Sequence, residues 1–410
     1  MAKTSAKIGR VALYFLLLAG PVLGLATKGF APLLAIAGST AFIAVLMQTE
    51  KLQQVEFRKF ILALPFLFFM GLSLLWSQAE NAGRTYFALI LVVVFIACLR
   101  ITFKSLPLDE QDKFKHRLSA SLLFGILISI SVGSYPLFWP ELSIAVNNIS
   151  NQLTFANIEL FRQSNRSLAL IPVFLFPLAG FYWHRARWLF ISLIAITFFI
   201  TANSNSQTAF LAISLGTIIF LFAYFYKYEG KKLIFSVSAI GLLLSPIIFM
   251  KSFENSLVQH YAPQIIKQKA SAEQREWIYY TYANEALSRP FIGHGLRSTK
   301  NFTPENLNNY IKLAQERNIP HSLVHAHNFP LQVIFEFGYL GATLFLAAFW
   351  CLLNLRFDNA GRATHAATLA ATCGLLLFSY SLWQSWLLAS LGFLYFYMSI
   401  LYRREHRNNV

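Results

Sequence analysis

Long apolar blocks without a charged residue are the feature that most restricts how this chain can fold. Val11–Ala26, Phe60–Trp76, Leu189–Ala202 and Ile234–Met250 are four of them. A helix needs roughly 20 mainly apolar residues to cross the hydrocarbon layer of a bilayer. A buried helix of a soluble protein keeps one polar face, which these blocks lack. With 56% hydrophobic and 13% charged residues, the sequence predicts an all-α polytopic membrane protein.

The apolar pattern predicts about twelve transmembrane helices. Their expected ranges are 10–27, 31–48, 59–77, 83–100, 117–138, 166–183, 187–203, 207–226, 232–250, 332–354, 363–383 and 385–402. The first range could also be a secretory signal peptide, because basic residues precede it and Gly24-Leu25-Ala26 resembles a cleavage site. The number of further spans favours an uncleaved helix.

Basic residues gather in alternate connections between these ranges, which predicts the orientation of the chain. The set comprises Lys3, Lys7, Arg10, Lys51, Arg58, Lys104, Lys113, Lys115, Arg117, Arg185, Arg187, Lys227, Lys231, Lys232, Arg356, Arg362, Arg403, Arg404 and Arg407. The positive-inside rule therefore places both termini in the cytoplasm, with the protein in the inner (plasma) membrane. This distribution accounts for most of the net charge of +16 without a nucleic-acid partner.

Two segments on the opposite, periplasmic side interrupt the membrane pattern: 139–165 and the larger 251–331. The second divides the chain into transmembrane helices 1–9 (1–250), a helical periplasmic loop (251–331), and helices 10–12 with a cytoplasmic tail (332–410). Within the loop, Ala272–Ser288 has helical periodicity, with Trp277, Tyr280, Ala283 and Leu287 on one face. Pro290 and the following glycines should end that helix. A loop of this length usually folds and has a function.

His327-Asn328 is the most specific motif, and it lies where the tenth span begins. Nine residues separate it from Gly338-Tyr339-Leu340-Gly341, whose glycines would allow close packing against a neighbouring span. A histidine that titrates near neutral pH could take a proton from a sugar hydroxyl, or could simply be a polar residue of the membrane interface. Glu336 lies nearby and is expected to have a partner, such as an arginine or His327, because an unpaired carboxylate there is costly.

This pattern resembles the hallmark of the O-antigen ligase and polymerase superfamily. The upstream segment also fits, because Arg275 begins a helix that is followed by Pro290-Phe291-Ile292-Gly293-His294-Gly295. The resemblance implies a helical membrane glycosyltransferase of the C type (GT-C fold). It also implies a glycan donor on undecaprenyl pyrophosphate and no metal or other cofactor.

The resemblance further implies residue roles. His327 would activate the acceptor hydroxyl, and Arg275 and Arg166 would hold the pyrophosphate. Asn328, Gln207, His294, Arg297 and Arg162 are candidate substrate contacts. Gln207 marks a departure, because many relatives have an arginine in that turn; it could bind substrate or only cap the next helix. Guanidinium groups stay charged and offer forked donors to phosphate oxygens.

The sequence gives weaker support to other chemistries. His321, His325 and His327 could suggest zinc, but no carboxylate or cysteine is close to them in the sequence. Within the resemblance, the expected function is an O-antigen ligase that transfers the glycan to lipid A–core, in a site surrounded by membrane lipids and without nucleic acid. A polymerase that uses a lipid-linked repeat unit as acceptor and a protein O-glycosyltransferase share the same motifs. A transporter of lipid-linked glycan is the alternative from another class, although no paired halves are visible.

Overall fold

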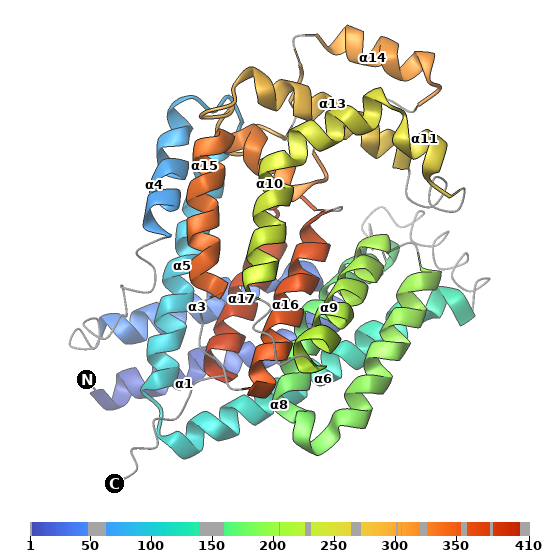
Figure 1. Ribbon diagram of the computed structural model, residues 1–410. Coiled ribbons are helices and arrows are strands. Elements are labelled where there is room, and N and C mark those ends of the chain that lie inside the picture. The colour runs from blue at the N-terminus through green and yellow to red at the C-terminus, as the bar shows by residue number, and fades with distance from the viewer. Residues whose placement is uncertain are drawn as a thin grey trace, which may run out of the picture.

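The computed structural model describes residues 2–47, 63–138, 160–204, 206–225, 231–263, 272–300, 302–304, 306–319, 326–353, 359–377 and 380–401. Every regular element in these ranges is a helix (Figure 1). In chain order the elements are α1 (Ala2–Phe15), η1 (Leu16–Leu18), α2 (Ala19–Leu25), η2 (Thr27–Gly29), α3 (Phe30–Leu46), α4 (Leu64–Leu72), η5 (Ser73–Leu75), α5 (Ala82–Lys104), α6 (Leu108–Phe138), α8 (Leu160–Asn203), α9 (Gln207–Phe225), α10 (Lys231–Glu254), α11 (Leu257–Tyr261), α13 (Ala272–Ser288), α14 (Leu307–Glu316), α15 (Phe329–Leu353), α16 (Asn359–Leu377) and α17 (Ser385–Leu401).

Within the described residues, 8 helical stretches are long and apolar enough to cross a membrane. They are Thr4–Leu25, Thr27–Leu46, Ala82–Lys104, Leu108–Tyr135, Asn165–Asn203, Gln207–Phe225, Leu233–Glu254 and Phe329–Trp350. Leu64–Leu75 and Ser385–Leu401 are apolar but shorter. The ranges 166–183 and 187–203 both fall in α8, whose two arms meet at the non-helical Ala186. The chain is therefore a multi-pass membrane protein, and the count of twelve spans stays a prediction.

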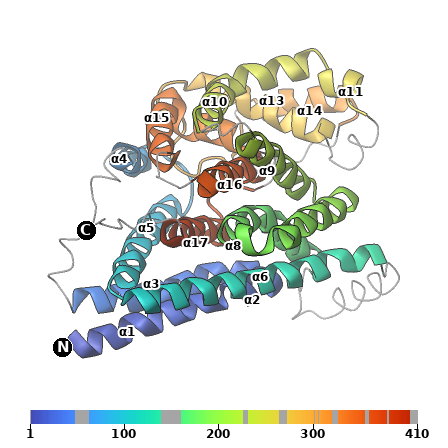
Figure 2. The same cartoon turned by 60° about the horizontal axis from the view of Figure 1, so that its bottom comes forward.

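The helices form layers. Figure 2 shows α1, α2, α3 and α6 together on one side, α10, α13 and α15 on the other, and α8, α9, α16 and α17 between them. α2 and α6 come very close to each other. An added Cβ at Gly20 would overlap the Ser121 carbonyl, and one at Gly125 would overlap the Gly20 carbonyl. Small residues permit this approach, which membrane helices use in place of a hydrophobic driving force.

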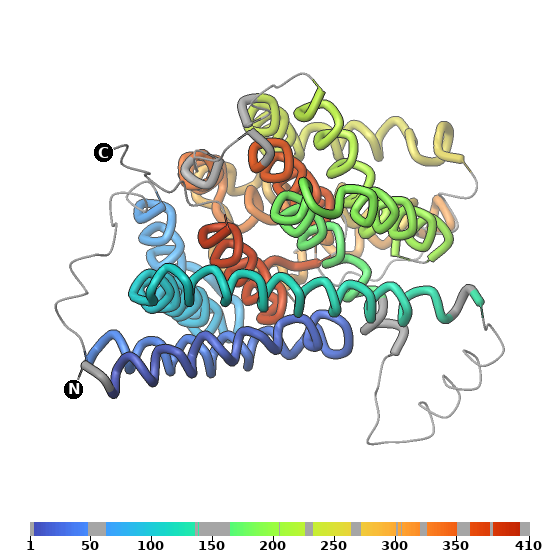
Figure 3. Tube along the Cα trace, turned by 90° about the horizontal axis from the view of Figure 1, so that it is seen from below, coloured from blue at the N-terminus to red at the C-terminus, as the bar shows by residue number. Residues whose placement is uncertain are grey.

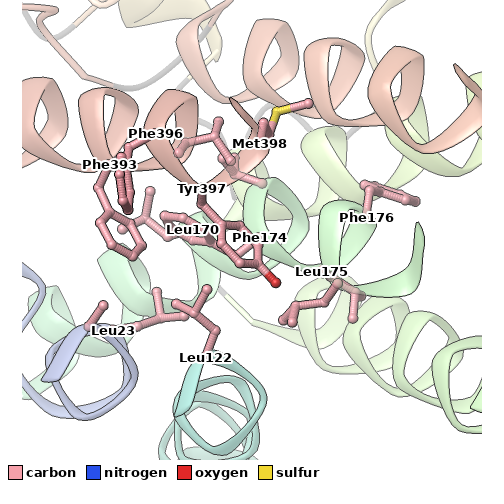
Figure 4. Packing of buried hydrophobic residues seen from close by; sticks show 14 of the residues in the cluster. Leu23, Leu122, Leu170, Phe174, Leu175, Phe176, Phe393, Phe396, Tyr397 and Met398 are labelled. Atoms are coloured by element: carbon pink, nitrogen blue, oxygen red, sulfur yellow. The ribbon is translucent and has the colours of Figure 1, made fainter. Parts of the chain in front are cut away.

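A first cluster of buried side chains joins the layers on the α8 side; we call it the bundle core. Figure 4 shows part of it, drawn from α2, α6, α8 and α17. Its members include Leu23, Leu122, Leu170, Phe174, Leu175, Phe176, Phe393, Phe396, Tyr397 and Met398. Dispersion between closely packed aromatic and aliphatic side chains stabilises this contact.

A second cluster, the site core, joins α4, α10, α13 and α15. It includes Phe69, Trp277, Tyr282, Leu296, Leu331, Phe335 and Phe337. The helix expected at Ala272–Ser288 is confirmed as α13 with the same bounds. Trp277 and Ala283 are fully buried, while Tyr280 and Leu287 are only partly buried. The described parts of the segment 251–331 thus pack on α4, α10 and α15 through a shared core, with α11, α13 and α14 at one end of the molecule (Figure 1).

Candidate functional site

The helix α15 is broken at Gly338, where the backbone takes φ 63° and ψ −170°. A break in a helix leaves backbone groups without their usual partners. Here the turn at 290–295 supplies them. The four hydrogen bonds run from His294 N to Phe335 O (2.9 Å), from Gly295 N to Glu336 O (2.8 Å), from Tyr339 N to Pro290 O (2.7 Å) and from Leu340 N to Phe291 O (3.1 Å). We call this arrangement of residues 290–295 and 335–340 the clasp.

Two glycines make the clasp possible. An added Cβ at Gly338 would overlap the backbone of Phe291, and one at Gly293 would lie 2.5 Å from the Glu336 carbonyl carbon. Both glycines also have positive φ, near 65°, which other residues rarely adopt. A Cβ at Gly341 would overlap Phe337 of the same helix and lie 3.0 Å from Phe69, so Gly341 allows close packing against α4, one of the shorter apolar helices. Gly338 differs, because it packs against the turn at 290–295 and not against a neighbouring span.

Glu336 is completely buried directly beside the break. Its carboxylate accepts four hydrogen bonds, from Thr299 Oγ1 (2.5 Å), Gln332 Nε2 (3.0 Å), the Arg297 backbone N (2.8 Å) and Trp383 Nε1 (2.7 Å). The expectation of a partner is thus met by neutral donors. An arginine does take part, but through its amide, not its guanidinium.

His327 immediately precedes α15 and is half-buried, with φ 47° in the left-handed region. Its carbonyl accepts a hydrogen bond from Tyr279 Oη at 3.4 Å. The next residue, Asn328, caps α15 by accepting from Leu331 N (2.9 Å) and donates to Leu377 O at the end of α16 (3.0 Å). The backbone at His327 is therefore held from α13, α15 and α16, and both polar side-chain atoms of Asn328 have protein partners.

Arg275 lies one turn before Tyr279 on α13. Burial raises the pKa of the Tyr279 hydroxyl to about 12, and the positive charge of Arg275 opposes that shift. Tyr279 was not among the site residues predicted from the sequence. Its spacing of four residues from Arg275 could have identified it, because this spacing puts both side chains on one helix face.

Arg166 and Gln207 lie at the ends of two other helices. The Ser206 hydroxyl donates to Asn165 O at 3.4 Å, so Arg166 on α8 neighbours the start of α9. An added Cβ at Gly374 of α16 would meet Ala212 of α9 at 2.9 Å. Because α16 ends at Leu377, the partner of Asn328, the start of α9 lies at the same end of the bundle as His327. Arg162 belongs to the first turn of α8.

His294 is part of the clasp, and Arg297 follows its turn by two residues. The His294 ring stacks on Phe335 (4.4 Å between centroids, 14° between planes), and its Nε2 is 3.0 Å from Glu285 O. Burial lowers the pKa of His294, against the effect of that backbone contact. Arg297 has φ 65°, and its guanidinium donates to Asn81 O (3.2 Å) and Thr85 Oγ1 (2.8 Å) at the start of α5.

Among the described residues, no group of three or more His, Cys, Asp and Glu side chains could hold a metal ion. His321 and His325, the other members of the zinc alternative, lie outside the described residues, as does most of the segment 139–165.

Comparison with known proteins gives a consistent family signal. Residues 190–346, which contain α13, the clasp and His327, match a family model described as O-antigen ligase. The chain is similar to proteins named "Putative polysaccharide ligase" from Rickettsia typhi and Rickettsia prowazekii, each 30% identical over 202 residues (48% of this chain and 48% of the relative). A third, from Rickettsia bellii, is 27% identical over 325 residues (78% of this chain, 74% of the relative).

The chain thus aligns with about half the length of the first two relatives. No solved structure matches it.

Proposed function

We infer that this chain, which belongs to the O-antigen ligase superfamily as its motifs indicated, transfers a glycan from undecaprenyl pyrophosphate to a hydroxyl of lipid A–core. The transfer takes place at the periplasmic face of the inner membrane and needs no metal. The family supports polysaccharide ligation in general, and the donor, the acceptor and the stereochemistry are our proposal.

His327 is the proposed base. In the reaction, the acceptor hydroxyl oxygen attacks the anomeric carbon of the first sugar of the donor, and the hydroxyl proton passes to the His327 ring. The bond between that carbon and the pyrophosphate oxygen breaks, and undecaprenyl pyrophosphate leaves with the electron pair. Attack opposite to the leaving group inverts the anomeric carbon. A histidine suits this step because the pKa of its ring lies near neutral pH.

Arg275 and Arg166 are the proposed pyrophosphate ligands. Negative charge grows on the leaving group as the bond breaks, and fixed guanidinium groups stabilise that charge most in the transition state. Arg275 extends from the same helix that holds the His327 backbone, and Arg166 lies at the same end of the bundle. Gln207, which stands where many relatives have arginine, would contribute a neutral contact.

The observation that carries this proposal is the link between α13 and the histidine. The helix that bears Arg275 also bears Tyr279, whose hydroxyl donates to the His327 carbonyl. The turn after α13 then closes the clasp on α15. The two family motifs, far apart in the sequence, are therefore one assembly, which supports a common role in one active site.

Complementation tests the proposal. In a strain that lacks this gene, wild type should restore a ladder of long chains on lipid A–core, seen by gel electrophoresis of lipopolysaccharide. His327→Ala and Arg275→Ala should leave core alone while polymerised lipid-linked glycan accumulates. Core that carries a single repeat in the variants would indicate a polymerase instead. A full ladder from His327→Ala at matched expression would contradict the catalytic assignment and favour transport.

A further inference from the structure

A cavity unrelated to the candidate site lies between α1 and the start of α6. It has a volume of about 220 Å³, and its lining includes the charged Arg10, Glu110, Lys113 and Arg117 and the apolar Leu13 and Phe114. Figures 2 and 3 show α6 running beside the rod that α1 and α2 form together. The cavity therefore combines a charged rim with an apolar floor at one end of two membrane helices.

The cations of this cavity differ in how far they are neutralised. Arg10 forms a forked pair with Glu110, Nε to Oε2 at 3.0 Å and Nη2 to Oε1 at 2.7 Å. Lys113 is 3.4 Å from Asp109, and both side chains are about two-thirds exposed (68% and 67%), so that pair is weak. In the described part of the chain Arg117 has neither an ion pair nor a hydrogen bond. The rim thus keeps unneutralised positive charge.

The apolar parts of the cavity continue into the membrane-facing surface. Leu13 and Phe114 on the floor are buried (2% and 5% exposed). Tyr14 on the rim is 52% exposed and lies on one face of α1 with Val11, and both Val11 and Leu18 of the following η1 are also about half exposed. A ligand with a phosphate at the rim could therefore lay a hydrocarbon chain along that face, as a free anion could not.

We propose that this cavity binds the headgroup of an anionic glycerophospholipid, with the phosphate between Lys113 and Arg117 and an acyl chain along Val11, Tyr14 and Leu18. Lys113 and Arg117 are four residues apart on α6, so they lie on the same helix face. Basic pockets between transmembrane helices bind lipid headgroups through such cations. The positive-inside distribution puts this end of the bundle in the cytoplasmic leaflet, where anionic lipids supply the partner.

The test uses full-length protein purified in detergent, titrated with mixed micelles that contain dioleoylphosphatidylglycerol. The midpoint of thermal unfolding reports binding, because a ligand of the folded state raises it. Lys113→Gln and Arg117→Gln should each weaken the apparent affinity about fivefold, and Arg117→Lys should retain most of it. Arg187→Gln, which removes an exposed cation stacked on Trp188, is the matched control and should bind as wild type.

Three results would overturn the proposal. Equal protection by inorganic phosphate would make this a site for free anions. An equal rise in the unfolding midpoint with phosphatidylcholine would show that binding does not depend on Lys113 and Arg117 recognising an anionic headgroup. Equal weakening in Arg187→Gln would reduce the effect to general surface charge. Circular dichroism of each variant checks that the exposed substitutions leave the helices intact, and glycan transfer is not part of the readout.

Discussion

The bundle core and the site core differ in how they handle buried polar groups. In the bundle core, a buried hydroxyl such as that of Ser119 has a neutral partner, the Tyr397 hydroxyl at 2.8 Å. Among the described residues, the buried carboxylates Glu276 and Glu336 both lie in or beside the site core. Buried charge is costly unless fully hydrogen-bonded. The site core therefore accepts a cost that the bundle core avoids.

The backbone differs in the same way. In the bundle core, α2 and α6 approach each other through small residues, at Gly20 and Gly125, without a break in either helix. In the site core, α15 is interrupted at Gly338, and the turn at 290–295 supplies hydrogen-bond partners to the interrupted backbone. Unusual backbone conformations persist where the surrounding structure fixes them, and they gather at functional sites. We infer that the bundle core provides stability and the site core fixes the position of His327.

Removal of the Glu336 carboxylate should have the largest effect. Glu336→Ala removes the acceptor of four hydrogen bonds at a buried position, so we expect a loss of about 3–5 kcal/mol in the free energy of unfolding and no detectable transfer. Ser119→Ala in the bundle core should cost only about 1 kcal/mol. Denaturant unfolding in detergent compares the two. A similar cost for both variants would break the contrast between the cores.

Gly338→Ala should have the second-largest effect. The new Cβ would overlap Phe291, and alanine tolerates positive φ poorly, so we expect a loss of about 2–4 kcal/mol and a fall in transfer of at least about tenfold. Gly241→Ala in α10 is the matched control, because a Cβ there meets no atom within 4 Å; it should change stability by no more than about 1 kcal/mol. Normal activity in Gly338→Ala would show that the clasp is not needed for positioning.

Tyr279→Phe should affect activity more than stability. The variant loses one neutral hydrogen bond to the His327 carbonyl, and we expect transfer to fall about two- to tenfold. Burial keeps the pKa of Tyr279 near 12, so the hydroxyl stays protonated and the effect should be the same from pH 6 to about pH 9. Tyr397→Phe makes the same change in the bundle core and should leave transfer unchanged. A pH-dependent ratio between Tyr279→Phe and wild type would contradict the positioning role.

The smallest expected effect concerns pH. Burial lowers the pKa of His294 in the folded protein, so the unfolded chain binds its proton first as pH falls. Stability contributed by neutral His294 is present above its unfolded pKa of about 6.5 and is lost as pH falls from there through the folded pKa. His294→Gln should flatten this dependence between pH 7.5 and pH 5.5, measured as the shift in the thermal midpoint. An unchanged slope in the variant would assign it to other groups.

The sequence predicted local features well and the clasp poorly. The bounds of α13 followed from its periodicity and from Pro290 and the glycines after it, which are local signals. Gly338 was expected to help pack one continuous span. Its break depends on the turn 290–295, nearly fifty residues upstream in the chain, and no periodicity reports such a contact. Likewise, Glu336 was expected to pair with a charge or with His327, and only the folded arrangement supplies its four neutral donors.

The most direct test of the central claim is glycan transfer with purified protein in proteoliposomes, using a polyprenyl-diphosphate-linked glycan and lipid A–core. His327→Ala should lower the rate at least about a hundredfold, with the thermal midpoint close to that of wild type, because the fold holds His327 by its backbone and not by its ring. A rate within about twofold of wild type would contradict the proposal that the His327 ring takes the acceptor proton.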